Sequence, residues 1–139
     1  MRVDANVRVI QEFIEAHNAH DIEAMAELVA DDVRIGSGAD PAGVMQGRAA
    51  AVDFWTRILA TFPDHHFEAV TITAEGDRVV VELEESGTMR GALGPNAATG
   101  REFRVAAALR FGVDRAGQID TITSYFDMAA VGRQLELAG

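Results

Sequence analysis

The apolar residues of this sequence change their spacing once, and that change constrains the fold more than any other feature. Val3, Val7, Ile10 and Ile14 recur at intervals of four and three residues, which is the spacing of one apolar face on a helix. From Phe67 onward the apolar residues instead alternate every second position, as on strands with one buried face. Helices followed by strands predict an α+β domain whose sheet wraps around the early helices.

The signals at the ends of these patterns predict the individual elements. Asp21 is a suitable N-cap for a second helix, and Asp127 for a last helix that runs to about Leu137. Pro63 ends the third helix. The prediction is helices over 3–19, 22–29, 51–62 and 128–137, a long Gly-rich loop over 36–47, and strands over 33–35, 67–74, 78–86, 101–113 and 118–126.

Size and charge limit the possible partners and chemistry. At 139 residues the chain is expected to form a single domain over 1–139. A net charge of −10, without any basic run, argues against nucleic acid and anionic membranes as partners. The sequence contains neither Lys nor Cys, which excludes Schiff-base chemistry, thiol nucleophiles and thiolate metal sites. Without a signal-like or membrane-spanning apolar run, a cytoplasmic location is expected.

Several short motifs, in this order of elements, resemble one superfamily. They are Asn18-Ala19-His20-Asp21, Ala30-Asp31-Asp32-Val33, Phe62-Pro63-Asp64, Gly87-Thr88 and Tyr125-Phe126-Asp127 followed by Arg133-Gln134-Leu135. Together they resemble the nuclear transport factor 2-like superfamily, closest to its SnoaL-like polyketide cyclases, limonene epoxide hydrolases and ketosteroid isomerases. The resemblance implies a cone-shaped roll, in which a curved antiparallel sheet wraps around the N-terminal helices. It also implies a homodimer formed through the outer face of the sheet.

The catalytic positions that the resemblance carries over do not hold catalytic residues here. The ketosteroid isomerase positions fall at Phe13, Ser37 and Ala107. The final-strand Asp of the epoxide hydrolases and polyketide cyclases falls at Ser124, and the long-strand partners fall at Val105 and Ala107. Neither Ser nor Ala serves as a general base at neutral pH. The acid and base groups of an enzyme with this sequence must therefore lie elsewhere.

His17 is the first replacement candidate, because it follows Phe13 by one helical turn and faces the same way. With an ordinary pKa near 6.5, a histidine can act as a base or as a hydrogen-bond donor. The alternative is a histidine at the edge of the core that bonds a backbone carbonyl.

Glu82 and Glu84 are the second candidates, since they share one face of the predicted strand 78–86. Superposition on the family's Gly87 turn places both inside the cup. Simple alternation instead places Val79, Val81 and Leu83 inside and the two carboxylates in water. A carboxylate pair inside an apolar cavity would supply an acid and a base.

The expected pocket is mainly apolar and lies between the early helices and the sheet. The predicted ligand-binding residues are Phe13, Ile35, Ser37, Trp55, Val105, Ala107, Ile122, Ser124 and Phe126. The Asp64-His65-His66 cluster invites a metal interpretation, but adjacent histidines on an extended segment point to opposite sides. A solvated loop is the preferred interpretation, and neither a metal nor a cofactor is expected.

Two main functional hypotheses follow. The first is an enzyme that cyclises, isomerises or opens the epoxide of a small hydrophobic, oxygenated ligand by cofactor-free acid–base chemistry, using His17 with Glu82 or Glu84. The second is a non-catalytic binding protein of the same fold, which the missing acids favour. A third is an association module that uses its outer sheet face. The enzyme hypothesis requires an ionisable group deep in the cup, and both ligand hypotheses require an interior that is not filled solid.

Overall fold

The computed structural model describes residues 2–137. The helices are α1 (Arg2–Asn18), α2 (Ile22–Glu27), α3 (Arg48–Thr61) and α4 (Met128–Leu135). The strands are β1 (Val29–Ser37), β2 (Asp40–Gln46), β3 (His66–Glu75), β4 (Arg78–Thr88), β5 (Glu102–Val113) and β6 (Ile119–Phe126). The predicted α+β class and the cone-shaped roll are confirmed.

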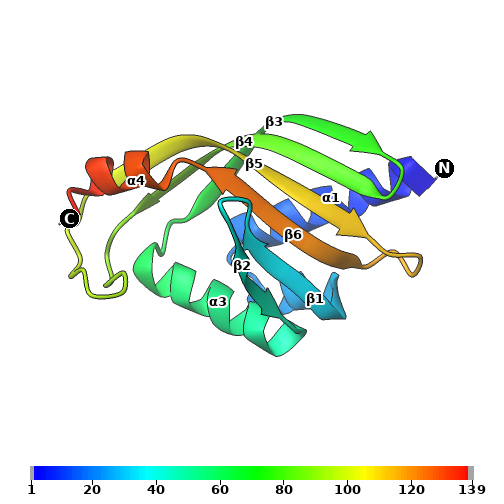
Figure 1. Ribbon diagram of the computed structural model, residues 1–139, viewed down its shortest axis with the longest axis horizontal. Coiled ribbons are helices and arrows are strands. Elements are labelled where there is room, and N and C mark those ends of the chain that lie inside the picture. The colour runs from blue at the N-terminus through cyan, green and yellow to red at the C-terminus, as the bar shows by residue number, and fades with distance from the viewer. Residues whose placement is uncertain (1, 138–139) are drawn as a thin grey trace.

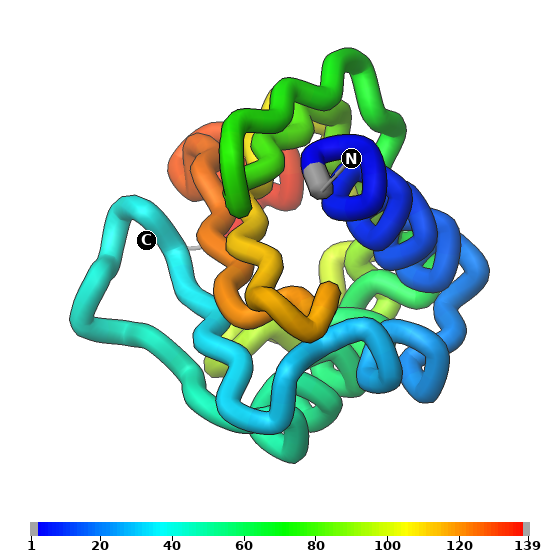
Figure 2. Tube along the Cα trace, turned by 90° about the vertical axis from the view of Figure 1, so that its right-hand side faces the viewer, coloured from blue at the N-terminus to red at the C-terminus, as the bar shows by residue number. Residues whose placement is uncertain are grey.

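One six-stranded sheet, in the order β2-β1-β6-β5-β4-β3, forms the wall of the roll. All its neighbouring strands are antiparallel except β1 and β6, which run parallel. The sheet curves around the interior, and α1 lies across its open side (Figure 2). Helix α3 lies beneath the sheet, and α4 follows the end of β6 (Figure 1).

Local sequence signals explain most of the element boundaries. The Asp21 carboxylate accepts a hydrogen bond from the Ala24 amide, and the Asp127 carboxylate accepts one from Ala130. Both residues are therefore the helix N-caps that the sequence predicts. Gly76 turns β3 into β4 with a φ of +58°, a conformation that glycine adopts without strain.

Two of the predicted elements are wrong. The second helix ends at Glu27, and Val29 begins β1 instead of extending the helical face. The predicted loop over 36–47 contains β2, which pairs with β1 through Ile35 and Met45. Its Gly and Pro residues are tolerated because β2 is an edge strand, where Pro41 need not donate to a neighbour.

Two apolar clusters form the core. The larger one joins the inner face of the sheet to α1 and α3, with Phe111, Ile10 and Val81 among its fully buried members. The smaller one lies around α4, where Phe62, Met89 and Phe103 pack against Val131 and Leu135. No helix within residues 2–137 is long and apolar enough to cross a membrane.

Candidate functional site

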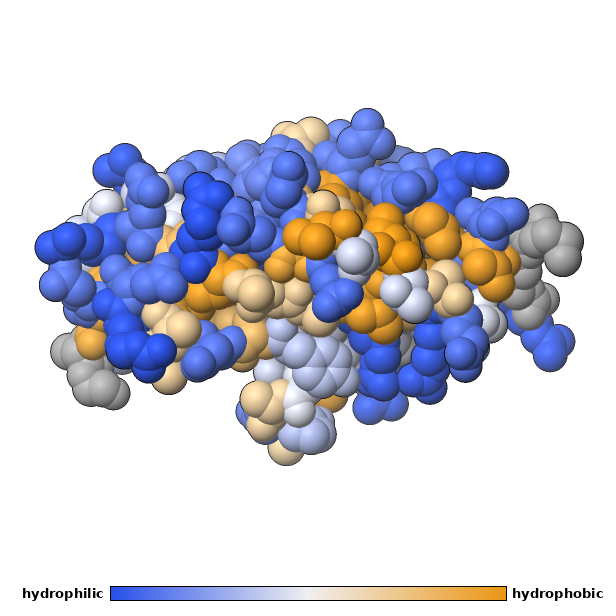
Figure 3. Space-filling view, turned by 90° about the horizontal axis from the view of Figure 1, so that it is seen from above, coloured by the Kyte–Doolittle hydropathy of each residue, from blue (hydrophilic) through white to orange (hydrophobic). Residues whose placement is uncertain are grey.

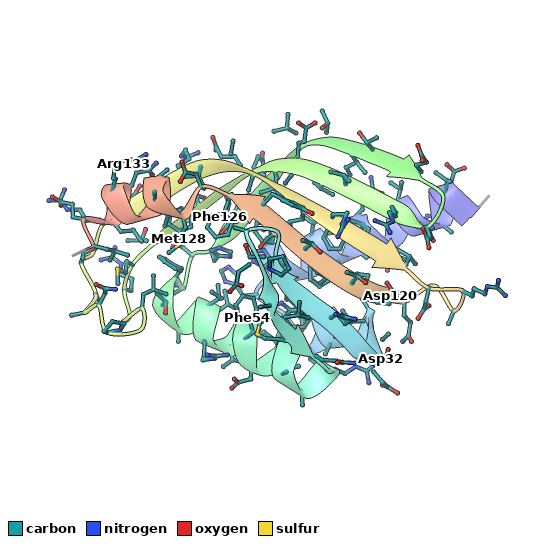
Figure 4. The ribbon with its side chains drawn as sticks, in the orientation of Figure 1. Asp32, Phe54, Asp120, Phe126, Met128 and Arg133 are labelled. Atoms are coloured by element: carbon teal, nitrogen blue, oxygen red, sulfur yellow. The ribbon has the colours of Figure 1, made fainter. Side chains whose placement is uncertain are left out.

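A cavity of about 350 Å³ remains between the helices and the inner face of the sheet. Phe13 from α1 and Trp55 from α3 meet edge to face in its wall, with ring centroids 5.7 Å apart. Phe54 and Phe126 approach it from α3 and from the end of β6 (Figure 4). Phe13, Trp55 and Phe126 therefore line the interior without filling it.

The sheet contributes both apolar and hydroxyl groups to the wall. Ile35 of β1 lies beside Ile122 of β6, and Ser37 lies beside Ser124 two residues further along the same pair of strands. The Ser37 hydroxyl accepts a hydrogen bond from the Ala39 amide at 3.1 Å, so its own proton remains free to donate. These four residues, the three aromatic ones and His17 all line the cavity.

Val105 and Ala107 are exceptions, because neither lines the cavity. Val105 is buried in the smaller cluster, together with Phe103. Ala107 is buried in the larger cluster, but the next inward residue of β5, Leu109, reaches the cavity instead. Strand β5 is longer than the cavity, so that its first half packs under α4.

The placement of Glu82 and Glu84 inside the cup is wrong. Both lie on the outer face of β4, where Glu82 accepts from the Thr71 hydroxyl and Glu84 pairs with Arg104. Strict alternation puts Val81 and Leu83 inside. The same alternation turns Glu85 inward, and Glu85 lines the cavity.

Glu85 ends a buried polar network that consists of Asn18, His17, His65 and Glu85. Glu85 Oε2 lies 3.0 Å from His65 Nε2, and His65 Nδ1 lies 2.9 Å from His17 Nε2. His17 Nδ1 lies 3.1 Å from Asn18 Oδ1. The side chains of His65 and Glu85 are only 7% and 13% exposed, so solvent screens their interaction weakly. The network thus brings ionisable groups from α1, β4 and the segment before β3 to one pole of an apolar cavity.

His65 is therefore not part of a solvated loop, contrary to the prediction. Its backbone amide donates to the Phe62 carbonyl, and its own carbonyl lies 3.0 Å from His20 Nε2. The neighbouring Asp64 accepts bonds from both the amide and the hydroxyl of Thr88 at 2.7 Å. Although burial alone would raise it, these bonds hold the pKa of Asp64 below its ordinary value. The turn before β3 is thus fixed to the end of β4, and it points His65 inward.

His17 is held by side chains and not by a backbone carbonyl. Its ring stacks on Phe67, with centroids 3.9 Å apart, and its two nitrogens contact His65 and Asn18. Burial, reinforced by the neighbouring His65, lowers the pKa of His17 from 6.5 to about 3, and the bond to Asn18 offsets only part of this shift. His17 is consequently a neutral imidazole at physiological pH.

Within residues 2–137, no group of three or more potential ligand side chains is arranged to hold a metal ion. His66, the neighbour of His65, points outward, where it lies 3.3 Å from the carboxylate of Glu68. The two adjacent histidines therefore lie in different environments: His65 belongs to the buried network, and His66 lies at the surface beside Glu68.

A profile of the SnoaL-like polyketide cyclases matches residues 7–135. The chain belongs to the SnoaL-like polyketide cyclase family. A comparison with curated proteins found no significant match.

Solved structures of related proteins agree with this family. A proposed polyketide cyclase from Xanthomonas campestris pv. campestris is 25% identical, with a TM-score of 0.88 over 97% of this chain and 99% of its own. A ketosteroid isomerase-like protein from Catenulispora acidiphila has 22% identity and a TM-score of 0.78, covering 94% and 93%. An LEH-like epoxide hydrolase from M. tuberculosis has 16% identity and a TM-score of 0.79, covering 98% and 92%. The last two show the shared fold alone.

In this SnoaL-like chain, two ionisable groups of the network, His65 and Glu85, lie outside the predicted site residues. Glu85 could have been found by extending the alternation of Val81 and Leu83 by one more step. His65 could have been found because adjacent residues of an extended segment point to opposite sides, so that one of His65 and His66 can face inward. Only the fold, however, brings both residues to His17 and Asn18.

Proposed function

We propose that this SnoaL-like protein is an enzyme that moves a proton on a small hydrophobic, oxygenated ligand, with Glu85 as the general base. The observation that carries this proposal is the ionisable pair of Glu85 and His65 at one pole of an otherwise apolar cavity. Glu85 Oε2 is engaged by His65, while its Oε1 has no hydrogen-bond partner among residues 2–137. A carboxylate with one free oxygen in a mainly apolar cavity is suited to accept a proton from a bound ligand.

The rest of the cavity supports a ligand with few polar groups. Apart from the pole at Glu85, the polar side chains of the wall are the hydroxyl groups of Ser37 and Ser124. A carbonyl or epoxide oxygen of the ligand could accept from the Ser37 hydroxyl, while its hydrocarbon part contacts Phe13 and Trp55. In cyclisation and isomerisation such a base takes a proton from the ligand, and in epoxide opening it takes one from the water that attacks the ring, while the bound oxygen accepts a hydrogen bond.

The test is deuterium uptake from heavy water into cyclic enones and lactones, followed by NMR, together with mass spectrometry of small epoxides. Wild-type protein should catalyse exchange next to the carbonyl or open an epoxide. Glu85→Gln keeps the shape of the side chain but not the base, and should reduce the rate by about 10²- to 10⁴-fold. Glu84→Gln, one residue away on the outer face, is the matched control and should retain it.

A non-catalytic binding protein is the second candidate, and the residues Phe13, Ser37, Ala107 and Ser124 at the family's acid positions favour it. In that case wild-type protein would bind probes from the panel without exchange or epoxide opening. Glu85→Gln would then bind them as tightly as wild type. An unchanged rate in Glu85→Gln would likewise overturn the role of Glu85.

We also propose that the protein forms a homodimer through the outer face of its sheet. Val70 of β3 is 71% exposed and Tyr125 of β6 is 44% exposed, which leaves apolar surface on this wall. Viewed from above, hydrophobic side chains gather between hydrophilic margins (Figure 3). Sedimentation equilibrium of wild type and of Val70→Arg would test this proposal, because a charge at the interface should shift the protein to monomer. A monomeric wild type would contradict it.

A further inference from the structure

The side chain of Asn18 can adopt only one of its two amide orientations. Its Nδ2 donates to the Phe67 carbonyl at 2.8 Å, and its Oδ1 accepts from the Phe67 amide at 2.9 Å. A backbone amide can only donate and a backbone carbonyl can only accept, so a flipped Asn18 would lose both bonds. Asn18 therefore presents an oxygen, and not an NH₂ group, to its other neighbour.

That neighbour is His17 Nδ1, at 3.1 Å from Asn18 Oδ1. Because the amide oxygen only accepts, the Nδ1 atom must carry a hydrogen for this contact to be a bond. The remaining contacts, His17 to His65 and His65 to Glu85, each need one hydrogen as well. Three bonds in series thus require three protons.

Two neutral imidazoles and one carboxylate hold only two protons between them. The network must therefore hold one proton more than two neutral imidazoles and an ionised carboxylate carry. His17 does not accept it, since burial and His65 lower the pKa of His17 to about 3. The remaining place is the pair of His65 and Glu85.

We infer that Asn18 is a positioning residue, which fixes the tautomer of His17 and thereby obliges the His65–Glu85 pair to retain a proton. With Nδ1 of His17 protonated, its Nε2 accepts from His65 Nδ1. Because an imidazole is ordinarily more basic than a carboxylate, the remaining proton lies on His65, which is then an imidazolium that donates to ionised Glu85. Without the acceptor at Asn18, the bonds can run the other way with two protons, and His65 is free to be neutral.

Other titratable groups lie around the network but do not complete it. His20 contacts the backbone carbonyl of His65, His66 points outward to Glu68, and Asp64 is bonded to Thr88. None of these side chains bonds to the ring of His17 or His65 within residues 2–137. Asn18 is thus the group that sets the direction of the bonds.

The catalytic consequence rests on the proposed function, whereas the proton count does not. In the resting enzyme, Glu85 is ionised beside a cationic His65, so that Glu85 Oε1 is ready to accept a proton from the ligand. Asn18 does not line the cavity, and acts through His17.

The decisive experiment is ¹⁵N NMR of the histidine side chains at about pH 7.5, which reports the protons on each ring nitrogen without any substrate. In wild-type protein, His17 should carry its proton on Nδ1, and both nitrogens of His65 should be protonated. In Asn18→Ala, the ratio of protonated to neutral His65 should fall by about 5- to 10-fold. This is the change in an equilibrium constant that the loss of one hydrogen bond produces. A wild-type His17 with its proton on Nε2 alone, or a neutral His65, would overturn the inference.

Two further variants separate this role from simple packing. Asn6→Ala makes the same substitution on the same helix, at a buried Asn whose side chain donates to the Gly76 carbonyl, and should leave both histidine spectra unchanged. Asn18→Asp keeps an acceptor beside His17 and should retain the Nδ1 proton, even where Asn18→Ala fails to fold. Loss of the Nδ1 proton in Asn18→Asp would contradict the inference. Since no turnover is measured, a failure here is distinct from a failure of the proposed function.

Discussion

Glu84 and Glu85 are neighbours on β4 and have the same side chain, but the sheet separates them into two environments. Glu84 lies on the outer face, 42% exposed, and pairs with an Arg104 that is 68% exposed. Glu85 lies on the inner face, 13% exposed, and pairs with a His65 that is 7% exposed. The comparison shows that the side of the strand, and not the residue type, decides whether a carboxylate is surface charge or a candidate base.

The largest expected difference is in stability. Glu85→Leu leaves His65 without its buried partner, and should lower the free energy of unfolding by about 3–5 kcal/mol. Glu84→Leu removes an exposed pair, and should change it by less than about 1 kcal/mol. Urea unfolding at about pH 7 measures both. Equal losses of unfolding free energy in the two variants would show that the inner and outer carboxylates do not differ in their contribution to stability.

The second prediction concerns pH and tests the burial of His17. Its pKa is about 3 in the folded protein against 6.5 ordinarily, so the unfolded chain binds more protons between these values. Its contribution to the free energy of unfolding should therefore fall as the pH drops below 6.5, by up to about 1.4 kcal/mol per unit, and should not vary above it.

His17→Gln carries no titrating group, and should lose stability less steeply than wild type between about pH 6.5 and pH 4.5. His66→Gln is the control, because the His66 side chain is 45% exposed and should leave the slope as it is. Parallel curves for wild type and His17→Gln would mean that His17 titrates normally in the folded state.

A smaller effect is expected on the outer face. At a protein concentration low enough to separate the subunits of the proposed dimer, a double-mutant cycle of Glu84→Ala and Arg104→Ala should give a coupling energy of at most about 1 kcal/mol, which shrinks as salt is raised to about 1 M. The same cycle for Glu85 and His65 should keep its coupling in salt. A salt-insensitive outer pair would indicate that this face is buried in an assembly.

The smallest effect is expected at Val70, which is 71% exposed. Val70→Ala should change the free energy of unfolding by less than about 0.5 kcal/mol at low protein concentration, where each subunit is alone. A larger loss that grows with concentration would identify Val70 as an interface residue.

The fold follows from the sequence wherever the signal is local. Asp21 and Asp127 cap their helices, and alternating apolar residues place β4 and β5, because capping and strand periodicity depend on residues a few positions apart. The segment over 36–47 misleads because its Gly and Pro residues resemble a loop, and only pairing with β1 makes it a strand.

The site depends on contacts that no local pattern contains. His17 and His65 are 48 residues apart in the sequence, and His65 and Glu85 are 20 apart. The prediction therefore includes His17 and part of the cavity wall, such as Trp55 and Ile122, but not the partners of His17. Those partners depend on how the turn before β3 is tied to the end of β4.

The ends of the six-stranded sheet have a consequence for behaviour at high concentration. One edge is β2, which contains Pro41, and the other is β3, whose pairing shifts at a bulge between Ala69 and Thr71. A missing amide and an interrupted ladder both hinder the addition of a strand from another molecule. The two sheet edges therefore hinder edge-to-edge association of these chains into fibrils at high protein concentration.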